Sequence, residues 1–416
     1  MRRLTRQPTI ENPRRICVAG VTITASLLFL VVAPLLAQDS AVVLPGARPT
    51  IDAAKFPSLQ AAFDAVPESG GLVQLPAGTF EITEPLRLHT EDTCVEGAGT
   101  ATHIKNLNTE GQPALLVSHP ECNDAKTDRK HQLWRIRLAN LRITGNEKSG
   151  AGIEARQINE IFVDGATVSN NGGDGIFLNY CYEDPRVADC LITYNKKVGV
   201  NLQGCHDIIV SSCQFEENQD ALHCFDGFNL CMTGCCVDDH LGEGVVIENT
   251  YGSVVSGNMI EECKGTAIVL DRDCYGITLS ANVIAHNGGG IDLRDAHGCA
   301  VSANTFTILR TNALRIGPDS GRISVGGNNF SNSFIGEDKV RRGTEDLAAA
   351  GLVLEATKDV SISGNVFAGL TEKAITLVGE SRGIVFADNV LSDVDSDHPQ
   401  LKSGTVSNNQ ESEASN

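Results

Sequence analysis

A small residue followed by an aliphatic residue recurs along this chain at a nearly constant interval. The pair returns at steps of 22 to 24 residues, and after one insertion it returns at Gly351 and Ala374. A period of this size is typical of a solenoid, in which each repeat buries its apolar face only by stacking on its neighbours. The pairs of the uninterrupted series begin at Gly152, Gly175, Gly199, Ala221, Gly244, Ala267, Gly290 and Ala313.

Each repeat has the pattern of short strands rather than of helices. In residues 175–179, 199–203 and 290–294, apolar residues alternate with variable ones, which is the period of a half-buried strand. Repeated strands that run in one direction form parallel sheets, and parallel crossovers are almost always right-handed. The sequence therefore predicts an all-β fold, a right-handed parallel β-helix with coils of about 23 residues.

A second strand in each repeat carries an Asn or a Cys between apolar residues. Stacking of the coils aligns these residues into a column along the solenoid axis. Stacked Asn side chains can satisfy each other's hydrogen bonds, so we expect a buried amide ladder, with buried thiols that pack as small apolar groups rather than as disulfides. The column contains Cys190, Cys213, Cys235, Asn258, Asn282, Asn304 and Asn328, and a separate pair consists of Cys181 and Cys205.

A short helix is expected before the first regular coils. Apolar residues recur at helical spacing over residues 58–66, with Ser58 as a candidate N-cap and Pro67 as a stop. A helix at this end would cover the open edge of the sheets.

The segments FPSLQAAFDAV, GGLVQLPAGTFEITEPLRL and VEGAG, together with the later coils, resemble the pectate lyase superfamily of β-helix proteins. The resemblance extends over roughly residues 50 to 395 and implies the fold and a carbohydrate-active role, although many chemistries share this scaffold. The Asp-Pro-His motif of alginate C5-epimerases is incomplete, since Arg294 stands where the His belongs after Asp292. The polygalacturonase pattern is incomplete too: Asp174, Asp220 and Glu243 precede the small residues, but Gly-His-Gly is absent.

Residues 1–37 have the character of an export segment. Five Arg residues precede an apolar stretch over 16–37, which ends in a small residue before Gln38. This pattern predicts a signal peptide or an N-terminal membrane anchor, and hence a secreted, periplasmic or cell-surface protein. We expect a single β-helix domain over 38–395 and a polar, disordered tail over 396–416.

The chain is acidic, with 52 Asp and Glu residues against 33 Lys and Arg residues and a net charge of −19. Such a balance argues against nucleic acid as a partner. The expected partner is a polysaccharide, and the expected state is a monomer. Aromatic residues make up only 5% of the chain, and Trp134 is the only Trp, which leaves few platforms for stacking sugars.

Candidate functional residues lie on the outer face of the strand that begins with each small–aliphatic pair. Polar residues follow one another there in successive coils, where they could contact successive units of a linear polymer. For the reaction itself we select His223, Asp220, Glu243 and Asp226, and for substrate binding Asp292, Arg294, Arg272 and Glu248.

A divalent cation is a further expectation for the same face. Asp271, Asp273 and Asp295 come from adjacent coils, and Ca²⁺ prefers several carboxylate oxygens. Arg272 and Arg294 offer the alternative that the acids are neutralised without a metal.

Three functions remain open. A polysaccharide lyase or C5-epimerase removes a proton beside a uronate carboxylate, which needs a base such as His223 and a cation such as Arg294. A glycoside hydrolase needs two carboxylates, for which Asp220 and Glu243 are candidates. The third is a non-catalytic polysaccharide-binding or cell-surface structural solenoid.

Overall fold

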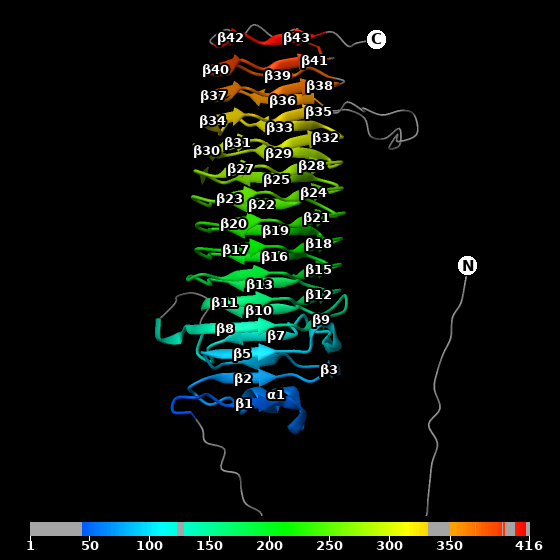
Figure 1. Ribbon diagram of the computed structural model, residues 1–416, viewed down its shortest axis with the longest axis vertical. Helices are drawn as coiled ribbons and strands as arrows, with labels where there is room; N and C mark the ends of the chain where they lie inside the picture. The colour runs from blue at the N-terminus through cyan, green and yellow to red at the C-terminus, as the bar shows by residue number, and fades with distance from the viewer. Residues whose placement is uncertain are drawn as a thin grey trace, which may run out of the picture. The chain divides into compact units, whose positions relative to one another are not determined.

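Three parallel β-sheets wind through the unit formed by residues 48–416 (Figure 1). The computed structural model describes residues 44–122, 129–331, 350–370, 372–392, 394–395 and 404–412. Successive coils contribute strands to each sheet in turn, and the paired strands are parallel, as in β10 with β13 and β13 with β16. The predicted right-handed parallel β-helix is confirmed.

The sheets differ in the number of strands, and we name them A, B and C. Sheet A has 17 strands: β1 (Thr50–Asp52), β2 (Gly71–Gln74), β5 (Thr93–Glu96), β8 (Leu133–Ala139), β11 (Ile158–Asp164), β14 (Arg186–Ala188), β17 (Ile209–Ser211), β20 (Cys231–Thr233), β23 (Val254–Ser256), β26 (Cys274–Tyr275), β27 (Thr278–Ser280), β30 (Ala296–His297), β31 (Ala300–Ser302), β34 (Gly321–Gly326), β37 (Lys358–Ser363), β40 (Arg382–Ala387) and β42 (Thr405–Ser407). Sheet B has 14 strands: β3 (Gly78–Ile82), β6 (Thr102–Asn106), β9 (Arg142–Thr144), β12 (Thr167–Ser169), β15 (Leu191–Thr193), β18 (Gln214–Glu216), β21 (Cys236–Asp238), β24 (Met259–Glu261), β28 (Val283–Ala285), β32 (Thr305–Thr307), β35 (Asn329–Ser331), β38 (Val366–Ala368), β41 (Val390–Ser392) and β43 (Gln410–Ser412). Sheet C has 12 strands: β4 (Leu86–Leu88), β7 (Leu115–Ser118), β10 (Ile153–Arg156), β13 (Ile176–Asn179), β16 (Val198–Gln203), β19 (Asp220–Phe225), β22 (Val245–Glu248), β25 (Thr266–Asp271), β29 (Gly289–Leu293), β33 (Asn312–Ile316), β36 (Ala350–Glu355) and β39 (Ile375–Val378).

The small–aliphatic pairs lie in register at the start of the strands of sheet C. Ile153 pairs with Ile176, which pairs with Val200, so equivalent residues of the repeat stack directly on one another. The small residue is required by the close approach of the coils: a Cβ atom added to Gly175 would lie 2.6 Å from the carbonyl oxygen of Gly199.

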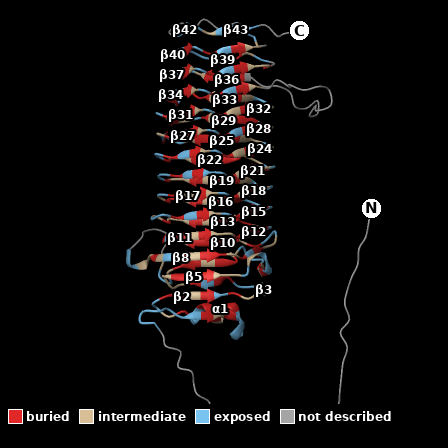
Figure 2. Ribbon diagram, viewed as in Figure 1, coloured by how far each residue is buried: buried red, intermediate tan, exposed pale blue. Residues whose placement is uncertain are grey.

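The inward-facing residues form one continuous apolar core (Figure 2). Like residues stack in columns, as the sequence repeat requires. Phe306, Phe330 and Phe367 stack with ring centroids 4.8 Å apart and nearly parallel planes. The middle ring, Phe330, thereby buries both faces against its neighbours, which keeps the spacing of the coils regular.

The predicted Asn ladder is confirmed between sheets A and B. The side-chain amide of Asn258 donates to the Oδ1 atom of Asn282 at 3.0 Å, and Asn282 donates to Asn304 at 3.0 Å. The backbone N–H of each Asn donates to the same oxygen, so one acceptor serves two donors. The ladder includes Asn328, the last residue of the predicted column, and continues beyond it through Asn365, Asn389 and Asn409.

The cysteines of the column are buried thiols, as predicted. The Sγ atoms of Cys190, Cys213 and Cys235 each donate to backbone carbonyl oxygens. Cys190, Cys213 and Cys235 are free thiols that form no disulfide. The column of stacked sulfurs therefore takes the place of the amide ladder in these coils.

A second ladder, which the sequence analysis did not identify, runs between sheets B and C. Asn171 donates to Asn195, and Asn195 donates to Asn218, with Nδ2–Oδ1 distances of 2.8 Å. His240 occupies the next position of this ladder. Its Nδ1 atom lies 3.3 Å from the carbonyl oxygen of Asn218, and its Nε2 atom is buried without a hydrogen-bond partner.

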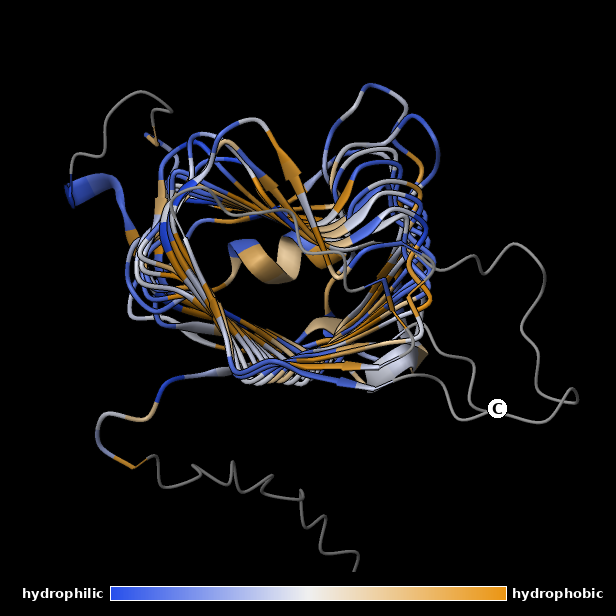
Figure 3. Ribbon diagram, turned by 90° about the horizontal axis from the view of Figure 1, so that it is seen from above, coloured by the Kyte–Doolittle hydropathy of each residue, from blue (hydrophilic) through white to orange (hydrophobic). Residues whose placement is uncertain are grey.

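The N-terminal end of the solenoid carries the expected helix. Helix α1 spans Leu59–Asp64, and the Oγ atom of its N-cap Ser58 accepts a hydrogen bond from the backbone N–H of Ala61 at 3.1 Å. Viewed along the solenoid, α1 lies within the outline of the coils (Figure 3), and its apolar residues join the core. Short 3-10 helices are η1 (Ala53–Lys55), η2 (Gly99–Ala101) and η3 (Arg129–His131).

The coils extend past residue 395, where the sequence predicts a disordered tail. Strands β42 and β43 pair with β40 and β41 and so add to sheets A and B. Asn409 accepts from Asn389, which continues the ladder into this last coil and explains its order. The expected export segment, 1–37, lies outside the described residues. In the part of the chain that the structure describes, no helix has the length and apolar character needed to span a membrane.

Candidate functional site

The register of sheet C places the predicted outward residues in columns along one face. Asn201 lies beside His223, and His223 lies beside Val246 on the following coil. Asp292 lies beside Arg315 in the same column. The sequence period therefore assigns these residues to the columns in which they lie. Their contacts depend on the direction of each side chain.

Acidic residues that precede the small residue bind the backbone of the next coil. Asp220 accepts the backbone N–H of Glu243 at 2.5 Å, and Glu243 accepts the backbone N–H of Thr266. Asp174 accepts the backbone N–H of Val198 at 3.0 Å in the same manner. Each acid thus has one structural oxygen, and its second oxygen is directed elsewhere.

The second oxygen of Asp220 faces His223. Its Oδ2 atom lies 3.1 Å from the Nε2 atom of His223, which is buried and lacks hydrogen-bond geometry to it. The imidazole as a whole is half-buried, with 34% of the side chain exposed. Asp226, the fourth residue selected for the reaction, instead accepts a hydrogen bond from the side chain of Asn249 at 2.5 Å in the turn after β19.

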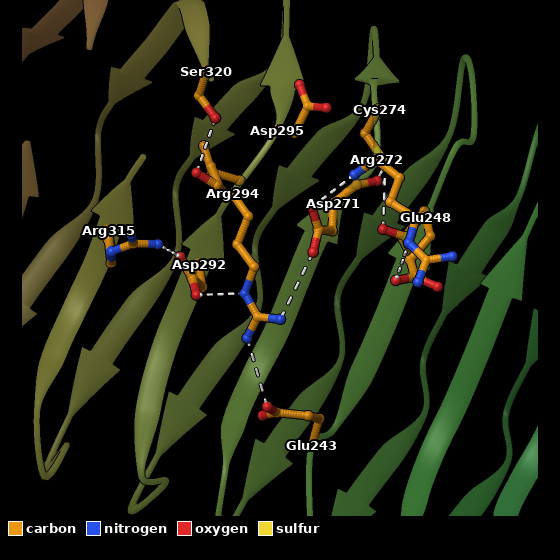
Figure 4. Close-up of polar contacts among 12 residues, drawn as sticks. Glu243, Glu248, Asp271, Arg272, Cys274, Asp292, Arg294, Asp295, Arg315 and Ser320 are labelled. Atoms are coloured by element: carbon orange, nitrogen blue, oxygen red, sulfur yellow. Dashed lines mark hydrogen bonds and ion pairs between the residues drawn. The ribbon is translucent and has the colours of Figure 1, made fainter. Parts of the chain in front are cut away.

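Arg294 lies among three carboxylates from three coils (Figure 4). Its Nε atom donates to Asp292 at 2.8 Å, while its terminal nitrogens lie 3.9 Å from Asp271 and 3.7 Å from Glu243. Burial lowers the pKa of Arg294, but the hydrogen bond to Asp292 and the three negative charges outweigh it and raise the pKa above its ordinary value. Glu243 therefore connects the His223 region to the Arg294 region across the intervening coil.

Arg315 extends the charged row by one further coil. It donates to Asp292 at 2.7 Å and to Glu355 at 3.0 Å, so Asp292 is held between Arg294 and Arg315. Sequence reasoning missed Glu355, because an insertion separates its coil from that of Arg315. The register of β33 with β36 reveals the contact.

Arg272 and Glu248, both predicted to bind substrate, form an ion pair at 3.2 Å. The guanidinium of Arg272 also lies 5.7 Å from the centre of the Phe225 ring. With 63% of its side chain exposed, Arg272 is more accessible than Arg294 and Arg315.

The acids predicted to bind Ca²⁺ divide between two environments. Asp271 faces Arg294, and its Oδ1 atom accepts the backbone N–H of Arg272 at 2.8 Å. Asp273 and Asp295 come together instead with His297, with ligand atoms within 4.8 Å of one another. Among the described residues, Asp271 belongs to no such group, so the three acids do not form one site.

The sequence matches a protein-family model over most of the solenoid. A family model for the right handed beta helix region matches residues 128–276, 189–330 and 244–414, which together span more than half of the chain. No curated protein matches the chain by sequence.

Solved structures with the same fold include several carbohydrate-related proteins. The A-module of the mannuronan C-5 epimerase AlgE6 of Azotobacter vinelandii aligns with 87% of this chain and 99% of its own, with a TM-score of 0.58 and 15% identity. DFA-IIIase of Arthrobacter chlorophenolicus, solved without its lid and in complex with GF2, aligns with 86% and 99%, with a TM-score of 0.59 and 14% identity. The tailspike protein of the E. coli bacteriophage HK620, solved with a pentasaccharide, aligns with 84% and 74%, with a TM-score of 0.57 and 12% identity. At these identities the likeness shows the fold.

Proposed function

Because this chain belongs to the right-handed β-helix family, we propose that it binds a polysaccharide along the outer face of sheet C and acts on it there. Structures that share the fold include an epimerase named for mannuronan and a tailspike solved with a pentasaccharide. A row of polar and charged side chains on successive coils suits a linear polymer, since neighbouring coils can contact neighbouring sugar units.

We propose proton transfer as the reaction, as in a lyase or C5-epimerase that acts on a uronate. The observation that supports it is the pairing of His223 with Asp220 on the outward face. An imidazole that faces a carboxylate can accept a proton, and the carboxylate stabilises the imidazolium that results. Asp220 is itself anchored through its other oxygen to the backbone of Glu243, so the position of its carboxylate beside His223 is fixed.

The arginines of the same face supply the cation that such a reaction needs. Charge develops on the substrate carboxylate when the neighbouring proton is removed, and positioned cations stabilise it. Among the described residues, Nε is the only Arg294 nitrogen within hydrogen-bond distance of a carboxylate, so the terminal nitrogens can donate to a uronate. Arg272 is more exposed and offers a second contact for the polymer.

Hydrolysis is the second candidate, and the same carboxylates argue against it. A glycoside hydrolase requires one carboxylic acid in its protonated form. Asp220 and Glu243 each use one carboxylate oxygen to accept a backbone N–H group of the next coil. Their other oxygens face His223 and Arg294, so both carboxylates are better placed to orient these two groups than to protonate a leaving group.

The test is a screen of the solenoid domain against uronate-containing and neutral polysaccharides. Absorbance of unsaturated products reports a lyase, deuterium uptake from heavy water reports an epimerase, and new reducing ends without unsaturation report a hydrolase. We expect uronate polymers to react and His223→Ala to abolish the signal. The matched control is His103→Ala on sheet B, where His103 contacts Thr144, and this variant should remain active.

Two outcomes would contradict the proposal. Reducing ends with full activity in the His223 variant would indicate hydrolysis by Asp220 and Glu243. Binding without turnover on every polymer would indicate a non-catalytic carbohydrate-binding solenoid.

We also propose that the protein acts outside the cytoplasm. The support is the Arg-rich start and the apolar stretch over 16–37, which have the order of an export signal. Fractionation of cells that express the full chain tests this: recovery of the solenoid only in the cytoplasm would contradict export.

A further inference from the structure

A pocket of 370 Å³ lies beside the first residues of strands β8 and β11 of sheet A. None of its lining residues belongs to sheet C. It is therefore separate from the row of His223 and Arg294. Its volume falls at the small end of the range of ligand pockets, about 300–1,000 Å³. Three rings and two amides line it: Trp134, Tyr182, His206, Gln132 and Asn159.

The pocket lies at one end of an exposed aromatic column. His206, Phe228, Tyr251 and Tyr275 occupy equivalent positions of successive coils and are joined by isolated β-bridges. Phe228 and Tyr251 stack with centroids 5.4 Å apart and planes at 16°. Rings stacked in this way cover each other's faces and present their edges to solvent. The faces of these two rings therefore pack against each other rather than against a ligand.

The ring contacts of the column continue into the pocket, where the rings are no longer parallel. Tyr182 meets His206 edge to face, with centroids 4.9 Å apart and planes at 84°. Tyr182 also lies beside Tyr180, with ring centroids 6.1 Å apart and planes at 36°, and both Tyr182 and His206 line the pocket. Trp134, which pairs with Asn159 across strands β8 and β11, adds its indole to the same space.

The polar groups of the pocket are oriented for hydroxyl groups. Asn159 is almost fully buried, and its Nδ2 atom donates to the Oε1 atom of Gln132 at 2.8 Å. This bond fixes the Gln132 amide with its NH₂ group left to donate to a ligand. Arg129 and Glu183, which also line the pocket, carry opposite charges, so the lining has no excess of either sign.

We propose that this pocket binds a neutral sugar unit of a polysaccharide, as a second carbohydrate site apart from the face of sheet C. Sugars combine apolar C–H faces, which pack on aromatic rings, with hydroxyls, which bond to amides and carboxylates. The pocket offers both sets of groups within a volume that suits one or two sugar units. This pocket and the proposed reactive face of sheet C would both bind a carbohydrate, but they use different residues.

Trp134 makes the proposal directly testable, because it is the only Trp of the chain. The Trp fluorescence of the protein therefore comes from this pocket alone. We expect titration with short neutral hexose oligosaccharides to change the Trp134 emission to saturation. Tyr182→Ala should weaken this binding about tenfold, since one aromatic contact contributes on the order of 1 kcal/mol.

The matched control is Tyr194→Ala, which removes an exposed Tyr that follows β15 of sheet B and does not line the pocket. The Tyr194→Ala variant should bind the oligosaccharides as the unmodified protein does. The thermal unfolding midpoints of both variants should equal that of the unmodified protein. Equal binding by the two variants would overturn the proposal, as would a constant emission with every sugar. A response to oligouronates alone would overturn the neutral assignment.

The turnover screen separates this proposal from the proposed reaction. Loss of turnover in His223→Ala with an unchanged Trp134 titration supports two independent sites. Loss of the Trp134 response in Arg294→Ala but not in Tyr182→Ala would place the binding on sheet C and overturn the pocket assignment.

Discussion

Asp220 joins the backbone of one coil to the candidate reactive group of its own strand: Oδ1 accepts the N–H of Glu243, and Oδ2 lies 3.1 Å from Nε2 of His223. One carboxylate thus contributes to the stacking of the coils and also places a negative charge beside the imidazole. This double role allows the two contributions to be separated by an isosteric substitution.

Asp220→Asn should lower turnover and leave the fold intact. The Asn side chain keeps an oxygen that can accept the Glu243 N–H, but it removes the charge that stabilises the imidazolium of His223. We expect a loss in kcat of about 10²-fold, at the low end of general acid–base contributions. Steady-state kinetics with a thermal unfolding curve check the result, and an unchanged kcat would exclude Asp220 from the reaction.

Arg294→Gln should act mainly on substrate binding. Its guanidinium holds three carboxylates together and keeps terminal nitrogens for a ligand. We expect KM to rise about tenfold or more, the value of roughly one charge-assisted hydrogen bond. Arg142→Gln, an exposed change on sheet B, is the control. A fall in kcat with no change in KM would contradict a role in binding.

Asn282→Leu should destabilise the solenoid. The Oδ1 atom of Asn282 accepts both the backbone N–H and the side-chain amide of Asn258, and both donors are buried. A buried donor left without a partner costs about 1–3 kcal/mol, so the thermal midpoint should fall clearly. Ser280→Ala, on the adjacent strand, should cost far less. A midpoint unchanged by Asn282→Leu would mean that water replaces the ladder.

His240→Asn should reduce the sensitivity of stability to acid. Burial lowers the pKa of His240 to about 4, from the ordinary value of 6.5. As the pH falls from about 6.5 to about 4, the unfolded chain binds a proton that the folded protein excludes, so stability is lost by up to about 3 kcal/mol. Above about pH 6.5 this penalty is absent.

The Asn variant lacks this proton and can accept from Asn218, which would continue the second ladder. Thermal unfolding at about pH 5 and about pH 8 should therefore show a larger gain for the variant at the lower pH. An equal pH dependence in the two proteins would show that His240 is solvated or already charged in the fold.

The candidate site could be predicted in position but not in contacts. The repeat assigns His223 and Asp292 to one outward column, and the structure places both there. The prediction of a single acidic cation site failed to anticipate that Asp271 faces Arg294 while Asp273 and Asp295 gather with His297. The sequence period determines which column a residue belongs to. The pairing of these acids depends instead on the direction of each side chain at its turn.

The aromatic residues show the same distinction. A content of 5% indicates few platforms for sugars, yet the coils bring His206, Phe228 and Tyr251 into one exposed column that leads to the Trp134 pocket. Composition averages over the chain, while a solenoid concentrates one position of each repeat into a line.

The sequence by itself determined the β-helix, the Asn282 ladder and the capping helix, because stacking of near-identical coils leaves equivalent residues a single place to lie. Only the tertiary structure decided which carboxylate meets which cation, that Glu355 reaches Arg315 across an insertion, and that His240 enters a buried ladder. These contacts join residues whose spacing along the chain carries no periodic signal, and short-range side-chain geometry, rather than the repeat, selects them.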